Sequence, residues 1–238
     1  MAPRPHRRGR RRGEIHLTGK LSAAVLVSGG GTNLQAFIDE IGEGRLALEL
    51  AVVISNNPDA GALERARRAG IASACVQNAH YAGRAEFDEA LASAVDRYEP
   101  DLLLLAGFMR ILTTAFVKRY AGRILNIHPS LLPRFPGLNT HQRAIDAGER
   151  VHGSTVHFVT EELDAGPRIM QGRVPVLPDD TAESLGSRVL TVEHKIYPAS
   201  AALFAAGRVA YREGEVWLDG QPLKEPLQYT LDASMHYS

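Results

Sequence analysis

The sequence predicts an α/β domain with a mostly parallel sheet and helices on both faces. Short runs rich in Val, Leu and Ile alternate along the chain with longer segments of helical periodicity. These runs are apolar throughout, as expected for strands that are buried on both faces. The chain has 238 residues, of which 45% are hydrophobic, so the domain can bury a sizeable core.

The first half of the chain carries this alternation most clearly. Residues 23–28 (AAVLVS) are expected to form a buried strand, and residues 32–41 then place their apolar side chains on one helical face. Pro100 ends a helix predicted over residues 83–98. The remaining elements are expected as strands over 48–55, 72–76, 101–106 and 123–127 and a helix over 61–69.

The second half is expected to differ in character. Strands are predicted over 153–159 and 168–176, one long helix over 181–206, and a terminal hairpin over 209–218. No internal repeat or linker rich in Pro, Gly and Ser divides the chain. We therefore predict a single domain over residues 21–238, with a C-terminal extension beyond the main sheet.

The formal net charge of zero is distributed unevenly. Residues 1–20 carry six arginines and Lys20 against Glu14, a net charge of +6. The other 218 residues hold 20 basic and 26 acidic side chains, a net charge of −6, so no nucleic-acid partner is expected. We interpret residues 1–20 as a disordered extension, because they have few apolar residues and no aromatic residue to stack on a base.

The composition also indicates the cellular compartment of the protein. No apolar run approaches the ~18 residues of a membrane-spanning helix, and the basic start lacks the apolar segment of a secretory signal. The single cysteine, Cys75, excludes an internal disulfide framework and any CxxC motif. We therefore expect a cytoplasmic protein without a membrane partner.

The glycine-rich segment GGGTN (29–33) lies between the first predicted strand and helix. Backbone N–H groups in such a turn, together with a helix N-terminus, suit a phosphate. Leu34 stands where the dinucleotide fingerprint needs its third glycine, no acidic residue follows the second strand, and the P-loop lysine is missing. A phosphate on the substrate therefore fits better than NAD or ATP. The alternative is a plain glycine turn with Thr32 as the helix cap.

Asn126 and His128 lie at the carboxyl end of a predicted strand, in the segment RILNIHPSLLP. Ligands bind at this edge of open α/β sheets, and strand alternation puts the two side chains on the same side. A carboxamide and an imidazole can stabilise an oxyanion and move a proton. The alternative is a buried histidine that is bonded only to the backbone.

Asp164 precedes Ala-Gly-Pro in the segment FVTEELDAGP. It is interpreted either as a turn cap or as the carboxylate that keeps His128 protonated. A catalytic metal is not expected, because His152 and His157 fit neither an HxH nor an HExxH pattern.

Together these segments resemble the phosphoribosylglycinamide formyltransferases of purine biosynthesis, the folate-dependent single-domain type. The motifs that carry the resemblance are SGGGTNLQAFID (28–39), LAGFMRIL (105–112), GRILNIHPSLLPRFPGL (122–138), HGSTVHFVTEELDAGP (152–167) and VEHKIYP (192–198). Their order and specificity imply the Rossmann-like formyltransferase fold, with 10-formyltetrahydrofolate as the formyl donor and the amine of glycinamide ribonucleotide as the acceptor.

The resemblance also implies roles for individual residues. Asn126, His128 and Asp164 would form a catalytic trio that stabilises the oxyanion and relays a proton, without a metal. Gly31, Thr32 and Asn33 would bind the substrate's phosphate, and Glu193 its ribose hydroxyls. The formylfolate would contact Arg84, Met109, Arg110, Ile111, Leu112, Asn126, Thr160, Glu161, Glu162, Leu163 and Asp164, with Arg84 meeting its carboxylated tail.

One position departs from the family pattern. Asn139 stands where the first histidine of a His-Thr-His motif is expected, which puts any substrate contact by that histidine in doubt. Asn139 with Gln142 is predicted to form a capping box that preserves the helix start.

Three other functions fit the sequence less well. A methionyl-tRNA formyltransferase would need a C-terminal RNA-binding domain of ~100 residues, and a formyltetrahydrofolate hydrolase would need a regulatory domain before the glycine turn. A non-catalytic nucleotide-binding module would not explain Asn126 and His128. The sequence does not decide between a monomer and a homodimer.

Overall fold

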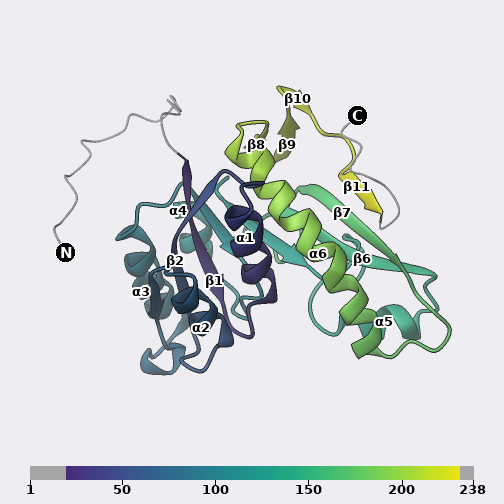
Figure 1. The fold of residues 1–238 in the computed structure, drawn as a ribbon, viewed down its shortest axis with the longest axis horizontal. Coiled ribbons are helices and arrows are strands. Elements are labelled where there is room, and N and C mark those ends of the chain that lie inside the picture. Colours follow the sequence, from purple (N-terminus) through teal and green to yellow (C-terminus); the bar gives the residue numbers. More distant parts are fainter. Residues whose placement is uncertain (1–19, 231–238) are drawn as a thin grey trace.

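The computed structural model describes residues 20–230, and within that range the chain folds around one large sheet (Figure 1). Eight strands of the described chain form this sheet, in the order β11-β7-β6-β5-β4-β1-β2-β3. Their bounds are β1 Leu21–Val27, β2 Leu48–Ser55, β3 Ser73–Cys75, β4 Leu102–Leu105, β5 Ile124–His128, β6 Val151–Phe158, β7 Arg168–Pro175 and β11 Leu227–Thr230. The predicted extension, residues 1–20, lies outside the described residues except for Lys20.

The sheet is mostly parallel, as predicted. Strands β1 to β5 all pair in parallel, and only β6 runs against its neighbours β5 and β7. The strand β11 returns to the sheet beside β7, again in parallel. The carboxyl ends of β1, β4 and β5 therefore meet at one edge, where ligands bind in folds of this kind.

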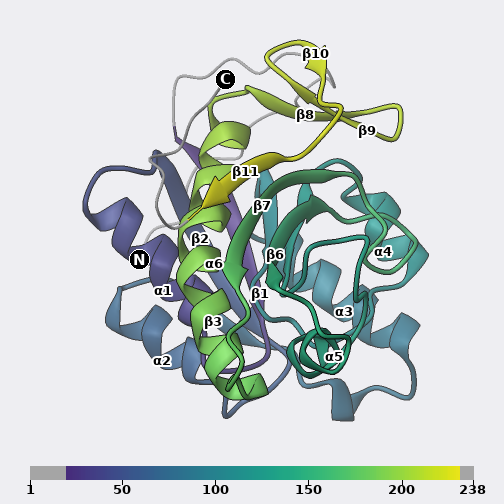
Figure 2. The same ribbon diagram turned by 90° about the vertical axis from the view of Figure 1, so that its right-hand side faces the viewer.

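Helices cover both faces of the sheet, and Figure 2 shows α1, α2 and α6 on one side and α3 and α4 on the other. The helices are α1 Thr32–Gly42, α2 Gly61–Arg68, α3 Arg84–Asp96, α4 Thr114–Arg119, α5 Thr140–Asp146 and α6 Ala182–Ala205, with a short 3₁₀ turn at Asn78–His80. Each layer follows from strand alternation. Ala23 and Val25 pack toward α1 and α6, whereas Ala24 and Leu26 pack toward α3.

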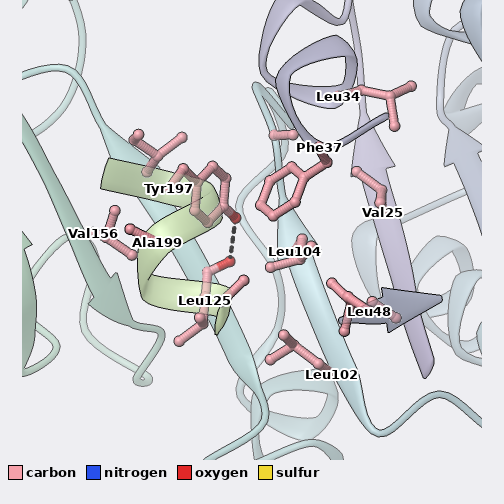
Figure 3. Packing of buried hydrophobic residues seen from close by; sticks show 14 of the residues in the cluster. Val25, Leu34, Phe37, Leu48, Leu102, Leu104, Leu125, Val156, Tyr197 and Ala199 are labelled. Atoms are coloured by element: carbon pink, nitrogen blue, oxygen red, sulfur yellow. Dashed lines mark hydrogen bonds between the residues drawn. The ribbon is translucent and has the colours of Figure 1, made fainter. Parts of the chain in front are cut away.

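The larger core is centred on Tyr197 of α6, a fully buried side chain. Its ring meets the ring of Phe37 edge-on, with centroids 5.0 Å apart (Figure 3). Its hydroxyl lies 3.0 Å from the carbonyl oxygen of Leu105 in β4 and 2.9 Å from that of Leu125 in β5. The phenol therefore fixes α6 against both strands, and the buried hydroxyl keeps its hydrogen-bonding partners.

Some elements of the described chain differ from the sequence-based expectation. The predicted hairpin is present as β8 Val209–Arg212 and β9 Glu215–Leu218, but β10 Gln221–Pro222 extends it into a separate sheet. Neither α4 nor β11 was expected. No helix within residues 20–230 is both long and apolar enough to cross a membrane.

Candidate active site

The centre of the site is the carboxyl end of β5, which carries Asn126 and His128. Antiparallel pairing sets Asn126 opposite His157 and His128 opposite Thr155 of β6. Pro129 follows directly and keeps His128 extended. The intervening Ile127 packs into the apolar core, so the two polar side chains share the other face of the sheet.

Asn126 is held by His157, a residue whose pattern in the sequence bears only on metal binding. The amide Nδ2 of Asn126 lies 3.1 Å from Nε2 of His157. Burial lowers the pKa of His157 to about 4, so its ring is neutral at pH 7. Since Nδ1 of His157 lies 2.9 Å from the carbonyl oxygen of Phe158, that nitrogen carries the proton and Nε2 accepts from Asn126. One hydrogen of the Asn126 amide is thereby fixed, and the second is left for a ligand.

His128 and Asp164 come together, although they are 36 positions apart in the sequence. Their side chains are almost fully buried, 7% and 8% exposed, with Nδ1 of His128 3.5 Å from Oδ2 of Asp164. The other ring nitrogen, Nε2, donates to the carbonyl oxygen of Phe135 at 3.0 Å. The N–H group of Gly137 donates to Oδ2 of Asp164 at 2.8 Å. The two side chains are therefore both hydrogen-bonded to the backbone of one short turn, residues 135–137.

The glycine turn brings Gly31 to the start of α1. Gly31 has a φ of 75°, and a Cβ there would lie 2.6 Å from the Cβ of Ala62. Gly31 itself occupies the N-cap position without a side-chain bond, so the alternative in which Thr32 caps the helix is wrong. The requirement for glycine is thus both conformational and steric.

Glu193 of α6 connects the glycine turn to strands β5 and β6. Its carboxyl accepts hydrogen bonds from Nδ2 of Asn33 at 2.8 Å and from Oγ of Ser154 at 3.0 Å. Burial raises the pKa of this carboxyl, and the two hydrogen bonds oppose that effect. The same Ser154 hydroxyl also lies 2.7 Å from the carbonyl oxygen of His128. Oδ1 of Asn33 is buried with no hydrogen-bond partner among the described residues, which leaves an acceptor for a ligand.

Comparison with known proteins identifies the family of the chain. A model of the formyl transferase family matches residues 21–201. The phosphoribosylglycinamide formyltransferase of Escherichia coli K12 is 49% identical over 212 residues, which are 89% of this chain and all of that protein. This chain belongs to the phosphoribosylglycinamide formyltransferase family. The crystal structure of the Coxiella burnetii phosphoribosylglycinamide formyltransferase is 51% identical and superposes with a TM-score of 0.82, over 86% of this chain and 96% of that one.

A related hydrolase shares the architecture at lower identity. A formyltetrahydrofolate deformylase from Pseudomonas syringae is 26% identical and superposes with a TM-score of 0.78. The match covers 84% of this chain and 66% of the deformylase. The same fold thus occurs in both a transferase and a hydrolase, and the distinction must come from the site itself.

Most of the residues that membership of the formyltransferase family implies for formylfolate binding lie on the surface. Met109, Ile111 and Leu163 are 69%, 55% and 56% exposed, which is unusual for large apolar side chains. Such exposure is typical of residues that a ligand covers. Leu112 is half-buried against the core of the α3 face. Thr160, Glu161 and Glu162 lie in the loop before Asp164, where Glu161 pairs with Lys118 at 3.3 Å.

Two arginines of the implied folate site lie near the start of α3. Arg84 is the first residue of that helix and is exposed. Phe87 lies one turn after Arg84 on the same helix. The Cζ of Arg110 is 5.9 Å from the ring centroid of Phe87. Two cations at one end of a ligand surface suit a ligand that carries carboxylates.

The capping box predicted at Asn139 and Gln142 is wrong. Asn139 takes a left-handed conformation, with a φ of 57°, and makes no side-chain bond to the start of α5. Gln142 instead donates to Asp146 at 2.7 Å. A capping box needs an extended N-cap residue whose side chain faces the first free amides, and the left-handed backbone does not supply that geometry.

Proposed function

We propose that the chain transfers the formyl group of 10-formyltetrahydrofolate to the amine of glycinamide ribonucleotide. The observation that carries this proposal is the meeting of Asn126 with the His128–Asp164 pair at the carboxyl end of β5. The relatives of similar length bear the name phosphoribosylglycinamide formyltransferase, which agrees with this chemistry. The reaction class is acyl transfer between two nitrogen atoms.

The formyl transfer proceeds through a tetrahedral intermediate. The amine attacks the formyl carbon, the carbonyl oxygen becomes an oxyanion, and the bond from that carbon to N10 of the folate then breaks. The free hydrogen of the Asn126 amide would donate to the oxyanion. Because Nε2 of His128 donates to Phe135, the nitrogen left to face the reacting atoms is Nδ1. At 3.5 Å from Asp164, the Nδ1–H group is not committed to a short bond and can turn to the oxyanion.

Asp164 has two roles in this proposal. Its negative charge favours the protonated form of His128, which stabilises the oxyanion better than the neutral ring does. Its carboxylate would also accept, through a water molecule, the proton that the attacking amine loses. The same proton would then pass to N10 as that nitrogen leaves, which restores the carboxylate. Each preorganised donor to the oxyanion lowers the barrier by roughly 3–4 kcal/mol.

Glycinamide ribonucleotide would bind between the glycine turn and α6. The N–H groups of Gly31, Thr32 and Asn33 would take the phosphate, at the amino end of α1. Glu193 and the unpartnered Oδ1 of Asn33 are two buried acceptors for ribose hydroxyls. The hydrogen bond between these residues holds both acceptors in place before the substrate arrives.

The formylfolate would cover the exposed apolar side chains. The pteridine and benzoyl rings suit Met109, Ile111, Leu112 and Leu163, and the carboxylated tail suits Arg84 and Arg110. The loop residues Thr160, Glu161 and Glu162 would border this ligand on the side of Asp164. We propose small molecules as the ligands, with no nucleic-acid or membrane partner.

The test follows formyl loss from 10-formyl-dideazafolate by its ultraviolet absorbance, with and without glycinamide ribonucleotide. Rapid loss is expected only when the amine is present. Rapid loss without it would favour the hydrolase chemistry named for the Pseudomonas syringae relative. Isothermal titration adds a second measurement, in which glycinamide ribonucleotide and the folate bind together while NAD and ATP do not bind.

A further inference from the structure

One turn touches both members of the His128–Asp164 pair through its backbone. The carbonyl oxygen of Phe135 accepts from Nε2 of His128 at 3.0 Å, and the N–H group of Gly137 donates to Oδ2 of Asp164 at 2.8 Å. The direct separation within the pair is 3.5 Å, longer than a normal hydrogen bond. The relative orientation of the imidazole and the carboxylate therefore depends on where this turn lies.

The backbone of this turn is not in a relaxed conformation. Phe135, Gly137 and Asn139 have φ angles of 54°, 78° and 57°, all in the left-handed region. That region is unfavourable for Phe135, whose Cβ crowds the following carbonyl oxygen. The turn must therefore be held by contacts from outside it.

Arg143 of α5 supplies such contacts. Its Nη1 donates to the carbonyl oxygens of Pro136 at 2.5 Å and Leu138 at 3.2 Å. Its Cζ also lies 5.5 Å from the ring centroid of Phe135, within the range of a cation–π contact. One guanidinium thus contacts three successive parts of the turn. A lysine could replace the two hydrogen bonds but would lose the planar group that lies over the Phe135 ring.

A second arginine, Arg134, lies over the same ring, but its hydrogen bonds go to Glu149 and not to the turn. The Cζ of Arg134 is also 5.5 Å from the Phe135 ring centroid. Its two terminal nitrogens both bond the carboxylate of Glu149, which neutralises its charge. Arg143 is therefore the arginine whose hydrogen bonds go directly to the turn.

We propose that Arg143 is a positioning residue for formyl transfer. It acts through the Phe135–Gly137 turn, which orients His128 and Asp164, and it touches neither substrate. This proposal rests on the function proposed above, since it gives Arg143 a place in the same reaction.

The groups that face His128 make its ring sensitive to the turn. Burial lowers the pKa of His141, and lowers those of His152 and His157 to about 4, so all three rings are neutral at pH 7. The negative partners of His128 are then the Asp164 carboxylate and the Phe135 carbonyl dipole. A displaced turn weakens the hydrogen bond from Nε2 of His128 to the Phe135 carbonyl, so the state of the ring reports where the turn lies.

The experiment compares Arg143→Met with Arg143→Lys and with Arg212→Met as a matched control. Arg212 also lies over an aromatic ring, with its Cζ 5.4 Å from the centroid of Trp217, but in the separate C-terminal sheet. We expect Arg143→Met to lower kcat about fivefold, in keeping with one partly exposed cation–π and hydrogen-bond contact. The KM of both substrates should stay within about twofold, and Arg143→Lys should recover only part of the loss. Arg212→Met should leave kcat unchanged.

A second readout separates positioning from general stability. The titration of the His128 ring is followed by NMR without substrates and assigned by its absence from His128→Ala. Its midpoint should move in Arg143→Met and stay unchanged in Arg212→Met. Phe135→Leu keeps the carbonyl but removes the ring under Arg143, so adding it to Arg143→Met should lower kcat by less than the two single losses combined.

The proposal is overturned if Arg143→Met keeps both the wild-type kcat and the wild-type His128 titration, or if its effects equal those of Arg212→Met. Should Arg143→Met fail to fold, Arg143→Lys and Phe135→Leu carry the same two readouts. Absence of formyl transfer by the wild-type protein would contradict the proposed function but would not by itself contradict the role of Arg143 in orienting His128 and Asp164. The His128 titration would still decide the role of Arg143.

Discussion

Asn126 donates a hydrogen bond to the neutral ring of His157, 3.1 Å away across the β5–β6 pair. The other nitrogen of that ring is occupied by the carbonyl oxygen of Phe158, so His157 can only accept from Asn126. His157 therefore fixes the orientation of the Asn126 carboxamide. A hydrogen-bond acceptor at position 157 is needed to keep the NH₂ group of Asn126, and not its oxygen, toward the reacting atoms.

The first prediction concerns this histidine. His157→Phe should lower kcat about tenfold or more, because the freed carboxamide can rotate its oxygen toward the oxyanion. His157→Gln retains an acceptor and should recover part of kcat. Steady-state kinetics with both substrates checks this. A His157→Phe enzyme with wild-type kcat and a native melting temperature would show that Asn126 needs no such partner.

Asp164→Asn tests the charge of the pair while keeping the shape of the side chain. Loss of the carboxylate removes the negative partner of His128, so the alkaline limb of the pH–rate profile should move to lower pH. The loss should fall mainly on kcat, since the oxyanion exists only in the transition state and intermediate. His128→Ala and the double variant should be similarly impaired, because the two residues act together. A wild-type kcat and pH profile in Asp164→Asn would remove Asp164 from the mechanism.

Gly31→Ala should weaken glycinamide ribonucleotide far more than the folate. The added Cβ would lie 2.6 Å from the Cβ of Ala62, so the turn must move and its N–H groups must leave the phosphate. Gly29→Ala is the matched control, because a Cβ at Gly29 meets nothing within 4 Å. Isothermal titration of each ligand measures the difference. Equal losses for both ligands would give the turn a purely structural role.

Arg84→Leu and Arg110→Leu should each raise the KM of the folate about fivefold, as expected for charges at the rim of a site worth ~1 kcal/mol each. The effect should be larger for Arg84 if it meets the carboxylated tail. Arg68→Leu, an exposed arginine of α2, serves as the control. Unchanged folate binding in both variants would contradict the assignment of this surface.

Glu193→Gln separates binding from stability. Burial raises the pKa of Glu193, so the folded protein holds the carboxyl proton more tightly than the unfolded chain does. The free energy of unfolding therefore falls as the pH rises above the ordinary carboxyl pKa of 4.5, and the neutral amide escapes this loss. We expect Glu193→Gln to melt at the same or a higher temperature at pH 7 but to bind glycinamide ribonucleotide more weakly. A large drop in melting temperature would mean that the carboxylate stabilises the fold.

Much of the fold could be predicted because its strands are apolar on both faces. The alternation located every strand from β1 to β9 to within a few residues. The helix α4 was missed because its six residues are too few to display a period. The strand β11 was missed because its four residues lie at the edge of the sheet and are too few to establish an alternation.

The site could be predicted only in part. The type and spacing of side chains indicate Asn126 and His128, whereas the choice of Asp164 over a plain turn cap depends on the family resemblance. The structure places His128 and Asp164 3.5 Å apart. The part played by Phe135 and Gly137 comes from backbone groups, which no side-chain pattern reveals. His157 lies on β6 and Asn126 on β5. Only the register between these two strands shows that the two residues stand opposite each other.

The hydroxyl of Tyr197 bonds one carbonyl group in β4 and one in β5, and Glu193 lies four residues earlier on the same helix. An α-helix turns by about 100° per residue, so four residues return nearly to the same face. A one-residue insertion between these two positions would leave the tyrosine anchored and swing the carboxylate away from Asn33. Length variation among natural variants of this chain should therefore be absent between 193 and 197.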